Sequence, residues 1–258
     1  MLNWFKRKKS HGKALAFVDY EYWFYSYKNK YGIRPDVGQW KAQLEREYDL
    51  VDLYIFADFA SAGLGEELRK LKAITDKVTD TGTIGQRLKK DMTDFIMLDE
   101  IYQSAVSRRG IDTFILFTGD GHFQSVVRYL IHKLGKRVVI YGVTETFSRS
   151  LQAAATETLL LPLESELYTR YREMILQDLA HCSKRYDIVP TFLSTIDAVV
   201  NRYGAIHEYT RRVLQELIDE GYVYQKEHRL RFGKTVRALA TDWERLIKEG
   251  IWDPERQG

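Results

Sequence analysis

The 258-residue sequence has little cysteine, no long apolar run and almost no net charge. Its one cysteine, Cys182, excludes a framework of intrachain disulfides and favours a reducing compartment, so we expect the cytoplasm. Because no run of about 18 apolar residues occurs, the sequence predicts no membrane span. A net charge of +3 does not by itself indicate a nucleic-acid-binding protein.

The N-terminal segment 1–13 carries five basic and no acidic side chains. The apolar run after it is too short for the h-region of a secretory signal peptide, so we expect none. The segment is either a solvated tail or an anchor for nucleic acid or an acidic membrane surface.

Several motifs that define other classes of enzyme are missing. The chain has no Gly-x-Gly-x-x-Gly or Gly-x-x-x-x-Gly-Lys turn for a nucleotide, and no Gly-x-Ser-x-Gly around a nucleophilic serine. A receiver domain also places aspartates at strand ends, but it requires a later strand-end lysine that residues 139–142 do not supply.

What the sequence does contain is a set of short apolar runs that end in aspartate. Residues 15–18 precede Asp19, residues 53–57 precede Asp58, and residues 114–117 precede a Thr-Gly-Asp-Gly turn that contains Asp120. Each run is typical of a buried parallel strand. If the three strands are neighbours, the carboxylates converge at the sheet edge where α/β proteins bind ligands. The alternative is that each aspartate only caps the helix after its strand.

Two more aspartates, Asp91 and Asp94, lie near the start of a helical pattern at residues 92–106 and share one helix face. We expect the apolar stripe of that helix to consist of Phe95, Leu98, Ile101, Tyr102 and Ala105. Clustered carboxylates repel one another unless a cation is present, and Mg²⁺ or Mn²⁺ prefers oxygen ligands. The predicted ligands of such an ion are Asp19, Asp58, Asp91, Asp94 and Asp120.

Strands and helices alternate as far as about residue 162. The expected strands are 14–19, 51–58, 76–79, 113–118, 137–141 and 158–161, and the expected helices are 22–30, 37–47, 64–75, 90–107, 122–133 and 147–155. This alternation predicts an α/β domain whose parallel sheet is covered on both faces. Residues 79–90 form either a plain connection or a phosphate-binding loop that uses Arg87, Lys89 and Lys90.

The pattern changes after Pro162. We expect a connector helix at 164–182, helices at 188–204 and 208–221, a hairpin at 222–232 with its turn near residues 227–228, and a last helix at 235–248. This order is typical of a small winged helix. The predicted organisation is a tail (1–13), an α/β domain (14–162), a connector (163–183), a winged-helix-like α+β domain (184–250) and a second tail (251–258).

The charge of the C-terminal domain is near balance, which suits a protein-contact module at least as well as a nucleic-acid reader. If this domain binds nucleic acid, its basic residues should face one side; they are Arg211, Arg212, Lys226, Arg229 and Arg231. We expect Tyr209, Tyr222 and Tyr224 to pack in the core or wing rather than to stack on bases.

The first 160 residues resemble the NYN domain, a branch of the PIN-like nuclease superfamily found in many bacterial proteins. Four places carry the resemblance: the strand that ends in Asp19, the strand that ends in Asp58, the helix start from Lys90 to Asp94, and the turn from Thr118 to His122. The resemblance implies a PIN-like three-layer sandwich with a mostly parallel sheet.

The resemblance also implies a metal-dependent ribonuclease. Asp19, Asp94 and Asp120 would carry Mg²⁺ or Mn²⁺, with Asp58 or Asp91 assisting, and Thr118 would orient the substrate or a water. RNA is then the expected partner.

Three positions depart from the family pattern. His122 stands where a second Asp is frequent, Tyr22 where an Asn is usual, and Glu157 follows Thr156 where an Asp is common. His122 is either a ligand for a softer ion, a proton donor to a leaving oxygen, or the mark of a site that has lost one metal. The alternative function is a catalytically degenerate scaffold that binds RNA or a protein. A protein partner for the C-terminal domain and a homodimer are further alternatives.

Overall fold

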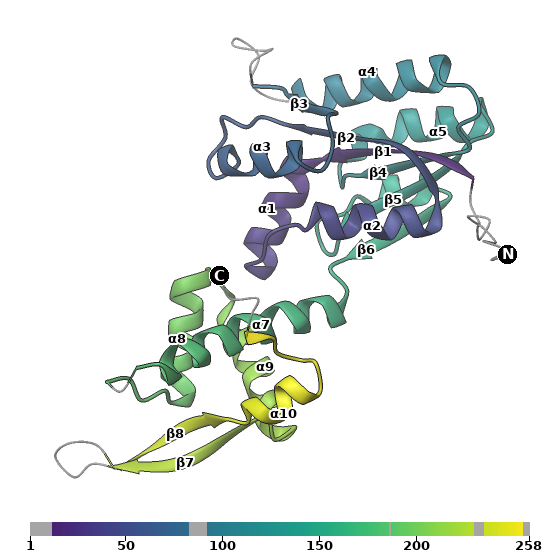
Figure 1. The fold of residues 1–258 in the computed structure, drawn as a ribbon. Coiled ribbons are helices and arrows are strands. Elements are labelled where there is room, and N and C mark those ends of the chain that lie inside the picture. Colours follow the sequence, from purple (N-terminus) through teal and green to yellow (C-terminus); the bar gives the residue numbers. More distant parts are fainter. Residues whose placement is uncertain (1–11, 83–91, 186, 230–234, 255–258) are drawn as a thin grey trace, which may run out of the picture. The chain divides into compact units, whose positions relative to one another are not determined.

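The structure is a computed structural model that describes residues 12–82, 92–185, 187–229 and 235–254 (Figure 1). Its contacts divide the chain into two compact units. The first is formed by Met1–Tyr27 and Arg34–Leu161, and the second by Lys28–Ile33 and Pro162–Gly258. Each unit has a sheet of its own.

The sheet of the first unit has six parallel strands in the order β3-β2-β1-β4-β5-β6. The strands are β1 (Lys13–Asp19), β2 (Asp49–Ala57), β3 (Val78–Asp80), β4 (Thr113–Phe117), β5 (Arg137–Val143) and β6 (Glu157–Leu161). Because β1 pairs with both β2 and β4, the three strands that lead to Asp19, Asp58 and Asp120 are neighbours. The predicted parallel α/β sheet is confirmed.

Helices cover both faces of this sheet (Figure 1). They are α1 (Tyr20–Tyr31), α2 (Val37–Glu47), α3 (Gly65–Lys72), α4 (Met92–Ser107), the 3₁₀ turn η1 (Gly121–Phe123), α5 (Gln124–His132) and α6 (Arg149–Ala154). Alternation along β4 sends Leu116 into the core formed with α4 and α5, while Phe117 stacks on Trp23 of α1 with ring centroids 3.8 Å apart. The three layers agree with a PIN-like sandwich.

The apolar stripe predicted for α4 is partly wrong. The helix buries Met97, Ile101 and Ser104, whereas Phe95 is 65% exposed and Tyr102 lies at the surface. Apolar side chains surround most of this helix, so their spacing alone does not select the face that meets the sheet.

The second unit contains α7 (Glu164–Ser183), α8 (Phe192–Tyr203), α9 (His207–Asp219), the antiparallel strands β7 (Val223–Arg229) and β8 (Thr235–Thr241), and α10 (Trp243–Lys248). The first three helices contact one another pairwise, and their order before a hairpin is the predicted one. The winged-helix assignment itself stays a prediction.

Two details of the predicted C-terminal organisation are wrong. Glu227 and His228 do not form a turn but lie within β7, where Glu227 pairs with Arg237 of β8. Residues 235–241 form a strand rather than the start of the last helix, which is N-capped by Asp242. Pairing with β7 and burial of Leu239 outweigh the helical propensity of this segment. The amide of Leu239 also donates a hydrogen bond to the carbonyl of Pro190.

None of the helices in the described ranges is long and apolar enough to cross a membrane.

Candidate metal centre

Asp19 is the last residue of β1, and its side chain is only 7% exposed. One carboxylate oxygen accepts a hydrogen bond from the amide of Tyr22 at 3.0 Å and so caps α1. The other oxygen accepts from the Thr118 hydroxyl at 3.4 Å. The strand, the helix start and the turn after β4 therefore hold this carboxylate together.

Burial raises the pKa of Asp19 from 3.8 to about 7. The negative charges of Asp94, Glu21 and Asp120 raise it further, while the hydrogen bond from the Tyr22 amide opposes them. The carboxylate is therefore costly to ionise, first because it is buried and second because the charges around it have its own sign; a nearby cation would offset both costs.

The turn after β4 places Asp120 and His122. One oxygen of Asp120 accepts from the His122 amide at 2.8 Å and lies 3.3 Å from Nδ1 of the same histidine. The amide of Asp120 in turn donates to the Thr118 hydroxyl at 3.3 Å. Thr118, completely buried, thus links Asp120 to Asp19 through one hydroxyl group.

Gly119 is required in this turn because Tyr22 packs directly against it. A Cβ atom at residue 119 would lie 2.4 Å from ring atoms of Tyr22. The Tyr22 hydroxyl accepts from the amide of Val143 at 2.8 Å and shares a hydrogen bond with Thr146 at 3.0 Å. Tyr22, one of the departures from the family pattern, therefore fixes the turn against the end of β5.

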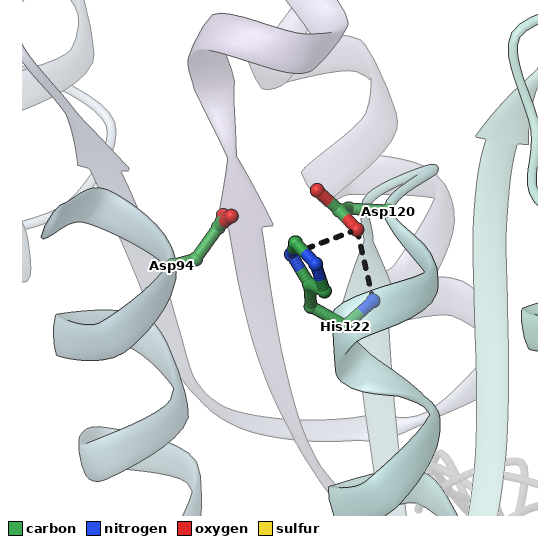
Figure 2. Close-up of side chains that lie close together, drawn as sticks. All are labelled: Asp94, Asp120 and His122. Atoms are coloured by element: carbon green, nitrogen blue, oxygen red, sulfur yellow. Dashed lines mark hydrogen bonds and ion pairs between the residues drawn. The ribbon is translucent and has the colours of Figure 1, made fainter. Parts of the chain in front are cut away.

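Asp94, in the first turn of α4, completes a group of three possible ligands. One side-chain ligand atom from each of Asp94, Asp120 and His122 lies within 4.8 Å of the other two. Figure 2 shows Asp94 facing the other two residues from α4. Asp94 and Asp120 are half-buried and His122 is exposed, so the group is open to solvent on one side.

The structure separates Asp58 from this group. Its carboxylate accepts from the amide of Ala60 at 3.0 Å, which caps the turn after β2. Capping is also observed for Asp19 and Asp120, as the simpler interpretation of the sequence expects, but it uses one oxygen of each. Asp91 lies outside the described residues, as do Arg87, Lys89 and Lys90 of the predicted phosphate-binding loop.

Glu21 was missed as a functional candidate by the sequence reasoning. Its carboxylate accepts from the amide of Asp58 at 2.6 Å and from the Thr93 hydroxyl at 3.1 Å, so it connects β2 to the start of α4. Its position in the first turn of α1, two residues after Asp19, was the available signal. Asp80 was missed as well, and it accepts from the amides of Phe59 and Gly82 at 3.3 and 3.2 Å.

Of the basic candidates predicted for the second unit, Arg211 and Arg212 lie on α9, Lys226 and Arg229 lie on β7, and Arg231 lies outside the described residues. Arg211 and Arg212 line a hollow of about 670 Å³ together with Glu208 and Glu216. Arg212 also forms an ion pair with Glu164. The mixed charge of this hollow does not favour an anion over a cation.

The sheet order, the layers and the carboxylates at the strand ends define an α/β protein of the PIN-like class. Residues 13–162 match the family model of the NYN domain, and the chain belongs to this family, whose members are generally nucleases. A crystal structure of a protein of unknown function from Vibrio parahaemolyticus is similar, with a TM-score of 0.52 and 21% identity over 59% of this chain and 95% of that one. This likeness concerns the fold alone. No curated protein matches the chain.

Proposed function

We propose that this protein is a metal-dependent ribonuclease that hydrolyses RNA phosphodiester bonds. The observation that carries the proposal is the convergence of Asp94, Asp120 and His122 beside the buried Asp19, in a domain of a nuclease family. RNA is the substrate class that the family suggests.

The residues fit a divalent cation. Asp94 and Asp120 supply the oxygen ligands that Mg²⁺ and Mn²⁺ prefer, and the imidazole of His122 favours Mn²⁺ as the softer ion. The raised pKa of Asp19 reflects first its burial and second the negative charge of Asp94, Glu21 and Asp120, and a nearby cation would favour the ionised form against both. The chemistry that such an ion supplies is Lewis-acid stabilisation of the charge on a phosphodiester.

Asp19 is suited to accept a proton beside this cation. Its pKa of about 7 describes the metal-free protein, and a cation held by Asp94 and Asp120 would lower that pKa, which favours the ionised carboxylate that can accept a proton from an attacking water. Thr118 holds the carboxylate oxygen that does not cap α1, and Asp120 holds His122 in place through its contacts with the amide and with Nδ1. We assign His122 as the third ligand, at the solvent side of the group.

Substitution of Asp120 by Asn tests the assignment with little change in side-chain volume. We expect cleavage of a labelled single-stranded RNA in Mn²⁺ or Mg²⁺ to fall at least about 100-fold, as is typical when an essential transition-state interaction is removed. Asp76→Asn is the matched control because Asp76 is a highly exposed aspartate of the same unit, and it should cleave like the wild type. Undiminished cleavage by Asp120→Asn would refute the site.

Metal binding separates the enzyme from the scaffold alternative. Calorimetry with Mn²⁺ should give a binding signal for the wild-type chain that is lost in Asp120→Asn. Absence of both the signal and cleavage at millimolar Mn²⁺ would instead favour the catalytically degenerate scaffold.

A further inference from the structure

The second unit contains a groove of about 350 Å³ between its hairpin and the end of α7. Tyr224, Lys226 and His228 line it from β7, and Ala238 and Ala240 line it from β8. Cys182 and Arg185 contribute from α7 and the segment after it. The volume is near the lower end of ligand pockets, which span about 300–1,000 Å³, and suits one small planar group rather than a folded partner.

Strand alternation and residue size create this groove. Tyr224, Lys226 and His228 are two residues apart, so they share one face of β7. Tyr224 pairs with Ala240 and Lys226 with Ala238, so each long side chain stands opposite a methyl group. Because Ala238 and Ala240 have short side chains, β8 does not cover the ring of Tyr224, which stays accessible.

Tyr224 differs in this respect from Tyr222. Tyr222 is 9% exposed and packs in the unit as expected, whereas Tyr224 is 49% exposed and lies at the groove. Tyr224 lies on the hairpin strand rather than in the core, because alternation along β7 turns it away from the buried face that holds Val223.

The charge of the groove has one sign. Within the described part of the chain, the residues that line it include Arg185, Lys226 and His228 and no acidic side chain. Among the described residues, neither Lys226 nor His228 makes an ion pair or a side-chain hydrogen bond. Arg185 pairs with Asp187 at 2.8 Å, but both side chains are at least half exposed, and such surface pairs contribute little.

We propose that this groove binds a single-stranded segment of RNA, with a base stacked on Tyr224 and the adjoining phosphates contacted by Lys226 and Arg185. An accessible ring beside Lys226 and the exposed Arg185 matches both parts of a nucleotide, its planar base and its phosphate. An acidic peptide offers the charge but not the planar face. The inference rests on the proposed function, since it assigns to the second unit a contact with the RNA that the first unit cleaves.

Fluorescence anisotropy of the full chain with a fluorescein-labelled 12-nucleotide oligouridylate in EDTA tests the groove without cleavage. Tyr224→Ala should weaken binding about 5- to 150-fold, as for the loss of one stacked base, and Tyr224→Phe should retain wild-type affinity. Lys226→Ala should lower the slope of log affinity against log salt by about 0.7, as expected for one phosphate contact of a single strand.

Arg229→Ala is the matched control. The sequence placed Arg229 among the basic candidates of this domain, but alternation along β7 turns it to the opposite face from Lys226, so the expectation that the basic candidates all face one side is not met. We expect Arg229→Ala to change the affinity less than twofold. Equal affinities of Tyr224→Ala, Lys226→Ala and Arg229→Ala would overturn the proposal, as would an undetectable affinity of the wild type or equal competition by a polyglutamate peptide.

The proposed function is tested separately, by measuring cleavage of the same RNA by the wild type and by Asp120→Asn in Mn²⁺. If the wild type cleaves the RNA but Tyr224→Ala binds it with wild-type affinity, the proposed RNA-binding groove is wrong and the proposed function stands. If Tyr224→Ala loses affinity for the RNA but the wild type does not cleave it, the ribonuclease assignment is wrong and the RNA-binding groove is supported.

Discussion

Replacing Asp19 by Asn should stabilise the metal-free protein at alkaline pH. The pKa of the buried carboxyl is about 7 in the folded state against an ordinary value of 3.8, so the ionised form is penalised by folding. Since one pKa unit corresponds to about 1.4 kcal/mol, the shift of about three units makes the penalty at pH 8 about 4 kcal/mol. Asn retains an oxygen that can accept from the Tyr22 amide but carries no charge.

The pH dependence follows from the sign of this difference. Between about pH 4 and 7 the folded state holds a proton on Asp19 that the unfolded state releases, so the wild-type protein loses stability as the pH rises through this interval. The advantage of Asp19→Asn should be near zero at pH 4, grow up to about pH 7 and stay constant at pH 8–9.

Urea unfolding in EDTA, followed by tryptophan fluorescence from pH 4 to 9, measures this difference. Asp36→Asn is the matched control, because Asp36 also caps a helix through an amide, that of Gln39 at 2.8 Å, but lies outside the carboxylate cluster. Its effect should be a small loss, with little change between pH 6 and 9. Two results would refute the reasoning. One is that Asp19→Asn and the wild type have the same free energy of unfolding at pH 8, and the other is that the stability gained by Asp19→Asn falls as the pH rises.

Three further predictions concern the same site. Gly119→Ala should destabilise the protein by about 1–3 kcal/mol in urea, because its Cβ would overlap the Tyr22 ring, and a neutral result would contradict the close contact. Tyr22→Phe should cost about 1–3 kcal/mol in the same assay, since the buried Val143 amide loses its acceptor, and an unchanged midpoint would show that water replaces the hydroxyl. Asp94→Asn should weaken Mn²⁺ binding about tenfold or more in calorimetry while leaving the metal-free midpoint near the wild-type value, and unaltered affinity would exclude Asp94 as a ligand.

Much of the first unit could be predicted because its signals are local. The helix Val37–Glu47 was predicted at its observed bounds, and each expected strand of the first unit is present within about two residues. Errors arose where pairing or packing overrides the local pattern. The strand Thr235–Thr241 exists because β7 pairs with it, and α4 exposes Phe95 because its apolar surface is wider than the face that meets the sheet.

The chemical types at the candidate site were determined by the sequence alone, since apolar runs that lead to Asp19, Asp58 and Asp120 predict carboxylates at the ends of buried strands. Only the tertiary structure decided which of them meet. Asp94 joins Asp120 and His122 because α4 packs against β1, β2 and α5, while Asp58 stays apart as the cap of its own turn. The raised pKa of Asp19 was likewise invisible in the sequence, because desolvation and repulsion depend on distances between residues far apart in the chain.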